Sequence, residues 1–178
     1  RAHFAGHSLG GMIGPAYARR YPDRVRSLGL WSTAAFRTPD DSAKVNAVVS
    51  AMRRKGIPRV LDTLSARWFT DEFIAERPDL IEKRKQQVID TPADVFLNVF
   101  DIYAQTEMAP WLHEISVPCQ LVTGAQDGGC NPRLNREMTD ALPNAELVIL
   151  DNLKHAIFIE ATERILPIVR EFLIRQDN

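Results

Sequence analysis

The chain has 178 residues, of which 45% are hydrophobic and 25% are charged, a composition typical of one globular domain. Its formal net charge of -1 excludes a basic surface for nucleic acid or anionic lipid, and no apolar run approaches the roughly 18 residues that a membrane span needs. Two cysteines, Cys119 and Cys130, make neither a disulfide framework nor a zinc site. We therefore expect a reduced, cytoplasmic protein with no metal, no cofactor, and neither nucleic acid nor membrane as a partner.

The first motif stands almost at the start of the sequence. Residues 1–5 are typical of the end of a buried strand, and Gly6-His7-Ser8-Leu9-Gly10-Gly11 follows them directly. The Gly-x-Ser-x-Gly spacing indicates a nucleophile elbow, a sharp strand-to-helix turn that exposes a serine hydroxyl. Gly6 and Gly10 are expected to let strand and helix approach closely around Ser8. A serine elbow normally follows several strands of its own sheet, so we expect the early strands of the fold to be missing from this sequence.

The rest of the chain alternates between two patterns. A helix over 9–20 and a buried strand over 25–31 predict a parallel βαβ unit. Residues 38–111 predict only helices, with Thr91 as an expected N-cap, and we interpret them as a helical cap inserted into an α/β core of residues 1–37 and 112–178. The α/β pattern then resumes with the elements that we expect at 117–123 (strand), 131–142 (helix), 146–150 (strand) and 162–175 (helix).

Ser8 needs a base and an acid, because a serine hydroxyl is a poor nucleophile until a base takes its proton. His155 is the candidate base, since it lies in a loop between the last strand and the last helix, where parallel sheets present ligand-binding groups. Asp127 is the candidate acid at the end of the preceding strand, although it could be only a turn former before two glycines. Asp151 is its competitor, and His7 is expected to be positioned by the turn alone.

The remaining requirements concern the oxyanion and the substrate. Two backbone donors must stabilise the oxyanion, and we expect the amide of Leu9, at a helix N-terminus, to be one of them. The other normally comes from a loop after an earlier strand, and that loop is not in this sequence. Apolar side chains are expected to line an acyl pocket, among them Trp31, Phe100 and Trp111.

Taken together, these residues and their order resemble the C-terminal two-thirds of an α/β-hydrolase. Besides the elbow, the matching segments are Tyr21-Pro22-Asp23-Arg24-Val25, Ile115-Ser116-Val117-Pro118 and Gly124-Ala125-Gln126-Asp127. Met12, the helical cap and Asp127-Gly128 resemble most the small carboxylesterase and 3-oxoadipate enol-lactonase branch. Lys154 before the histidine, Ala161 after Glu160, and Pro15 in the elbow helix depart from the family pattern. The resemblance implies a parallel sheet with a helical cap, completed by a separate N-terminal segment.

Two classes of function remain open. The leading hypothesis is a serine hydrolase that cleaves a small carboxylic ester or lactone through Ser8, His155 and Asp127 by way of an acyl-enzyme. The same triad would also serve perhydrolysis or carbon–carbon bond hydrolysis. The alternative is a non-catalytic fragment or a ligand-binding relative, inactive because it lacks the N-terminal strands and the oxyanion loop.

Overall fold

A computed structural model describes residues 1–177 of the chain, which divide into two units. The first unit combines Arg1–Phe36 with the segment that begins at Glu107, and the second is Arg37–Thr106. The second unit is therefore a continuous insertion into the first along the chain.

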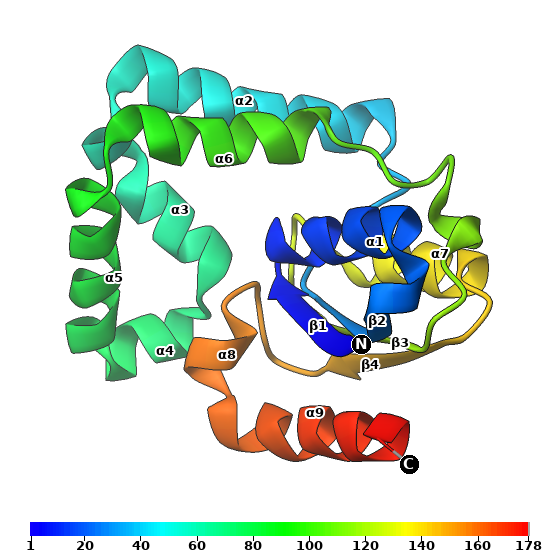
Figure 1. The fold of residues 1–178 in the computed structure, drawn as a ribbon. Helices are drawn as coiled ribbons and strands as arrows, with labels where there is room; N and C mark the ends of the chain where they lie inside the picture. The colour runs from blue at the N-terminus through cyan, green and yellow to red at the C-terminus, as the bar shows by residue number, and fades with distance from the viewer. Residues whose placement is uncertain (178) are drawn as a thin grey trace. The chain divides into compact units, whose positions relative to one another are not determined.

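The first unit is built on a sheet of four parallel strands in the order β1-β2-β3-β4, which leaves β1 at one edge (Figure 1). The strands are β1 (Ala2–His7), β2 (Val25–Trp31), β3 (Cys119–Gly124) and β4 (Ala145–Leu150). The two central strands are the most buried, as expected for parallel strands that are covered on both faces. This arrangement confirms the predicted α/β fold class with a parallel sheet.

Helices cover both faces of this sheet. Figure 1 shows α1 and α7 on one face and α8 and α9 on the other. The helices of the first unit are α1 (Gly10–Arg20), the 3-10 turns η1 (Pro22–Arg24) and η3 (Leu112–Glu114), α7 (Pro132–Ala141), α8 (Ile157–Glu160) and α9 (Thr162–Asp177). The α1 helix continues through Pro15. On the second face, α8 and α9 bury Ile157 and Ile165 against Val122 of β3.

One strand begins later than the sequence pattern predicts. The apolar run starts at Val117, yet β3 begins at Cys119. Pro118 lacks an N–H group and so cannot donate to the ladder. Its carbonyl nevertheless accepts from the Leu28 amide at 2.9 Å, and Cys119 is the first residue whose amide donates toward the β4 side, to the Asn144 carbonyl.

The second unit is entirely helical. Its elements are α2 (Pro39–Lys55), the 3-10 turn η2 (Ile57–Val60), α3 (Leu61–Trp68), α4 (Asp71–Glu76), α5 (Pro78–Asp90) and α6 (Ala93–Gln105). These helices enclose their own apolar cluster, which includes Met52, Leu64 and Val88. The unit thus has a hydrophobic core independent of the sheet.

Capping residues set several of these helix ends. Thr38 and Asp41 form a capping box at the start of α2, and the Thr70 hydroxyl accepts from the Phe73 amide at the start of α4. The prediction that Thr91 caps the following helix is wrong, because α6 takes Pro92 as its N-cap residue. The Thr91 hydroxyl instead donates to the Gln87 carbonyl at the end of α5. Among residues 1–177, no helix is both long enough and apolar enough to cross a membrane.

Candidate active site

Ser8 lies in the tight turn between β1 and α1. Its backbone has a φ of 57°, a left-handed conformation that is uncommon for a residue other than glycine. Its amide donates to the Trp31 carbonyl at 2.9 Å, which extends the β1–β2 ladder by one residue. Its own carbonyl accepts from the Gly11 amide and so leads directly into α1. This strained turn is the geometry that the Gly-x-Ser-x-Gly pattern predicts.

The glycines around Ser8 do not share one role. A Cβ on Gly6 would lie 2.2 Å from the backbone carbon and oxygen of Gly10, so only glycine fits there. A Cβ on Gly11 would lie 2.6 Å from the Thr33 side chain. Strand and helix do approach closely at Gly6 and Gly10, but of these two only Gly6 requires the absence of a side chain, since a Cβ on Gly10 would meet nothing within 4 Å.

Asp127 lies in the loop that follows β3 and is only 3% exposed. Its Oδ1 accepts hydrogen bonds from the amides of Gly129 at 2.9 Å and Cys130 at 2.8 Å. Its Oδ2 lies 2.8 Å from Nδ1 of His155. Burial on its own raises the pKa of Asp127, but the charge and hydrogen bond of His155, with the two amides, hold that pKa below its usual range. The carboxylate is therefore ionised and fixed in orientation at neutral pH.

His155 lies in the loop between β4 and α8, and its side chain keeps 17% of its surface exposed. Since its Nδ1 faces the carboxylate, that nitrogen carries the proton, and Nε2 is the nitrogen that can accept one. Burial on its own lowers the pKa of His155, but the charge and hydrogen bond of Asp127, with a contribution from Cys130, raise it above the ordinary value. The pair has the arrangement of a base and the group that orients it.

Gly124 explains why the two loops meet. A Cβ at this last residue of β3 would lie 2.2 Å from the Lys154 carbonyl oxygen and 2.4 Å from the Leu153 carbonyl oxygen. The absence of a side chain therefore lets the histidine loop pass directly over the end of β3. The Gln126 amide then donates to the Leu153 carbonyl at 2.9 Å and holds the two loops together.

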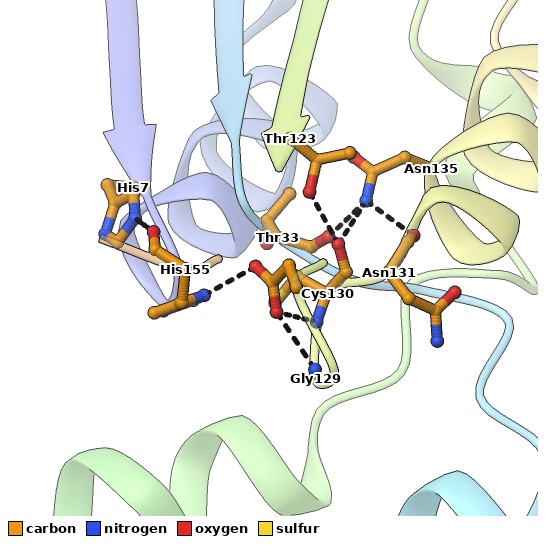
Figure 2. Close-up of polar contacts among 9 residues, drawn as sticks. His7, Thr33, Thr123, Gly129, Cys130, Asn131, Asn135 and His155 are labelled. Atoms are coloured by element: carbon orange, nitrogen blue, oxygen red, sulfur yellow. Dashed lines mark hydrogen bonds and ion pairs between the residues drawn. The ribbon is translucent and has the colours of Figure 1, made fainter. Parts of the chain in front are cut away.

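His7 contacts the histidine loop, a role that sequence reasoning missed. Its Nε2 donates to the backbone carbonyl of His155 at 2.8 Å (Figure 2). The two imidazole rings lie 4.7 Å apart between centroids, and Phe158 packs edge-on against His7. His7 thus links the elbow to the loop of the candidate base. The polar residue beside Ser8 was the only signal of this in the sequence.

A second group that sequence reasoning missed fixes the acid loop from behind. The side-chain amide of Asn135, fully buried in α7, donates to the carbonyls of Thr33, Cys130 and Asn131 (Figure 2). The Thr123 hydroxyl donates to the same Cys130 carbonyl at 2.7 Å. These bonds tie the end of β2, the acid loop and α7 together. An asparagine at the fourth position of a helix gives no sign of such contacts in the sequence.

Cys130 brings a thiol to the same place. Its Sγ, a carboxylate oxygen of Asp127 and a ring nitrogen of His155 all lie within 4.8 Å of one another. Cys130 is 1% exposed. Among the residues that the structure describes, this is the one group of three histidine, cysteine or acidic side chains with the spacing to hold a metal ion.

The predicted oxyanion donor and two of the predicted pocket residues lie in different parts of the first unit. Leu9 is the N-cap residue of α1, so its amide belongs to the helix N-terminal N–H groups that lack an intrahelical partner. Trp31 packs against Phe158 at 4.8 Å within the cluster of α8 and α9. Trp111 lies under the guanidinium of Arg19, which belongs to the last turn of α1. Ser8 precedes the first turn, so Trp111 contacts the opposite end of this helix.

Phe100 belongs to the second unit, where it packs against its apolar cluster and lies 5.3 Å from Phe96. Its assignment to an acyl pocket, with those of Trp31 and Trp111, stays a prediction. Asp151, the competitor of Asp127, is exposed, and its backbone carbonyl accepts from Arg164. His3 lies near the other end of β1, where its ring nitrogens contact Ser27 and Asp177.

Comparisons with known proteins identify the family of this chain. The family model described as the alpha/beta hydrolase fold matches residues 1–162. The 3-oxoadipate enol-lactonase 2 of Acinetobacter baylyi is 29% identical over 127 residues, which cover 71% of this chain and 47% of that protein. A pimeloyl-[acyl-carrier protein] methyl ester esterase of Neisseria meningitidis is 26% identical over 184 residues, covering 97% of this chain and 69% of the relative.

A solved structure gives the same result. The enol-lactonase from Burkholderia xenovorans superposes with a TM-score of 0.87 at 26% identity, over 98% of this chain and 66% of that one. The chain thus spans about half to two thirds of the length of these relatives. The predicted resemblance to the α/β-hydrolase superfamily and its enol-lactonase-like branch is confirmed.

Proposed function

This chain belongs to the alpha/beta hydrolase fold family, and we propose that it carries the Ser8–His155–Asp127 triad of a hydrolase for small carboxylic esters or lactones. The observation that carries the proposal is the 2.8 Å contact between His155 Nδ1 and Asp127 Oδ2. Both residues lie in loops at the carboxyl ends of the strands, as does the left-handed turn of Ser8. The relatives named as enol-lactonases and esterases support this class of substrate.

The proposed mechanism assigns one task to each group. The Nε2 atom of His155 takes the proton of the Ser8 hydroxyl as its oxygen attacks the acyl carbon, and Asp127 stabilises the imidazolium. The Leu9 amide donates to the oxyanion at the start of α1. His155 then protonates the leaving alkoxide, and a water molecule activated in the same way releases the acid from Ser8.

The second oxyanion donor requires a further segment. β1 lies at the edge of the sheet, so its outer side offers backbone groups to another parallel strand. We assign to an N-terminal segment the completion of the sheet on this edge and the missing donor. Loss of one such donor typically costs about 100- to 1,000-fold in rate, so activity depends strongly on that segment.

Two further assignments follow from chain order and chemistry. The helical unit Arg37–Thr106 leaves the sheet after the carboxyl end of β2, the edge at which such folds bind ligands, so we assign it the role of a cap that selects the substrate. Cys119 and Cys130 are both buried thiols, which is consistent with a reducing compartment such as the cytoplasm.

The test is intact-mass spectrometry before and after treatment with a fluorophosphonate, followed by hydrolysis assays with p-nitrophenyl butyrate and γ-butyrolactone. We expect one adduct, located on Ser8 by peptide mapping and absent from Ser8→Ala, together with hydrolysis that the same inhibitor abolishes. A folded protein with neither adduct nor hydrolysis, in the presence of its N-terminal segment, would overturn the proposal in favour of a non-catalytic ligand-binding protein.

A further inference from the structure

Cys130 has a fixed position beside the acid–histidine pair. It lies three residues after Asp127, and its amide donates to Asp127 Oδ1 at 2.8 Å. Its carbonyl accepts from the Thr123 hydroxyl at 2.7 Å and from the Asn135 amide at 2.9 Å (Figure 2). Three hydrogen bonds therefore hold this backbone, so the buried sulfur changes its position only by rotation of its own side chain.

The three side chains offer a donor set that suits thiophilic metal ions. Sulfur, ring nitrogen and carboxylate oxygen lie within 4.8 Å of one another. Zinc binds such atoms at about 2.0–2.3 Å in tetrahedral geometry, which places two ligand atoms about 3.4–3.6 Å apart. The widest pair therefore needs to close by about 1.2 Å or less, and the Asp127–His155 pair, now at 2.8 Å, needs to open slightly. Side-chain rotation alone covers such distances.

We propose that Asp127, Cys130 and His155 form a binding site for a thiophilic divalent cation such as Zn²⁺ or Cd²⁺. Thiolate and imidazole favour such ions over Mg²⁺ or Ca²⁺, which prefer oxygen ligands. Binding releases the Cys130 thiol proton, and any second proton on the imidazole, to the solvent, with no change of oxidation state. The exposed 17% of the His155 side chain gives the ion its access, and a solvent molecule completes the coordination. The spacing of the two cysteines gave no sign of this site, because two of its three ligands are not cysteines.

The site has a functional consequence that rests on the proposed function. If the ion binds Nε2 of His155, it occupies the lone pair that would accept the Ser8 proton. If the ion binds Nδ1, the remaining ring proton moves to Nε2, and that nitrogen is no longer a base. Either mode removes the general base, so the ion inhibits hydrolysis.

The first measurement is a titration of the purified protein with Cd²⁺. Binding is monitored through the ultraviolet charge-transfer absorption of a cadmium thiolate and by calorimetry. We expect one equivalent to bind with this absorption, and Cys130→Ser to lose the absorption and to weaken binding at least tenfold. Cys119→Ser is the matched control. Its sulfur donates to the Val117 carbonyl, two residues before it, and burial raises the pKa of this thiol to about 12.

Several outcomes would overturn the site: no absorption in folded wild-type protein, absorption that persists in Cys130→Ser, or absorption that is lost in Cys119→Ser. Circular dichroism and a second variant, Cys130→Ala, exclude misfolding as the cause of a loss. Ester hydrolysis is measured separately at each Cd²⁺ concentration. Binding with parallel inhibition, reversed by a chelator, supports both proposals. Binding without inhibition leaves the site standing but overturns His155 as the base.

Discussion

Replacement of Asp127 by asparagine tests the candidate site most directly. The side chain is nearly isosteric, and its oxygen can still accept from the amides of Gly129 and Cys130, so the loop keeps its shape. The other end of the side chain changes from an acceptor to an NH₂ donor, 2.8 Å from His155 Nδ1. The neutral imidazole then adopts the other tautomer, in which Nδ1 accepts a hydrogen bond and Nε2 carries the proton. Protonated Nε2 cannot take the proton of Ser8.

The expected cost is large and has a defined pH signature. An asparagine in this role lowers kcat by about 10,000-fold, which corresponds to about 5.4 kcal/mol of activation free energy. In the wild type, Asp127 raises the pKa of His155 against the opposing effect of burial, so hydrolysis increases with pH through a value above the usual 6.5 or so. Without the carboxylate, burial dominates, the pKa of His155 falls, and the residual acid limb moves to lower pH.

Initial rates of p-nitrophenyl butyrate hydrolysis between about pH 5 and pH 10 give both the loss of rate and the position of the acid limb. This range extends to both sides of the ordinary imidazole pKa of about 6.5. Asp151→Asn is the control, because Asp151 is exposed and belongs to the loop of His155; its rate should stay within about twofold of wild type. A rate for Asp127→Asn within about tenfold of wild type, or an acid limb that stays in place or moves to higher pH, would refute the reasoning.

Three other substitutions have defined outcomes. In Gly6→Ala the new Cβ would lie 2.2 Å from the Gly10 backbone, so this variant should lose about 1–3 kcal/mol of stability or more. Gly10→Ala should be neutral or gain up to about 1 kcal/mol. Equal melting temperatures of the two variants would contradict this. Asn135→Ala leaves three carbonyls without their side-chain donor and should cost about 1–3 kcal/mol in urea unfolding; an unchanged urea midpoint would refute it. His7→Phe keeps the ring but loses the donor to His155, and should lower kcat more than it raises KM; a change in KM alone would count against a positioning role.

Much of the first unit could be predicted from the sequence because local patterns there agree with the fold. The strand over 25–31 matches the bounds of β2, and the glycine-serine spacing predicts a turn that has a φ of 57° at Ser8. Asp127 and His155 were located by their position after consecutive strands, since loops at the carboxyl ends of parallel strands share one edge. Patterns that depend on sequence neighbours were therefore sufficient for these residues.

Contacts between distant segments could not be predicted in the same way. The Asn135 amide reaches the Thr33 carbonyl, 102 positions away, and nothing in either segment encodes that distance. The position of Cys130 was hidden because sequence spacing compares cysteines with cysteines, while its neighbours are a carboxylate and an imidazole. Thr91 shows the opposite error: its side chain suits a helix start, but a bond back to Gln87 places it at a helix end.

The register of the sheet explains how residues so far apart in the sequence form one site. His7 pairs with Trp31, and Trp31 pairs with Val122, while Gly124 pairs with Leu150, so the strands end nearly level. The ladder then continues for one residue past the ends of three strands, through the amides of Ser8, Ser32 and Ala125. Because strand residues alternate between faces, a slip of one position would move the side chains of the shifted strand to the opposite face of the sheet. The buried side chains of β2 and β3 prevent that slip, so the same apolar core that stabilises the sheet also fixes the distance between His155 and Asp127.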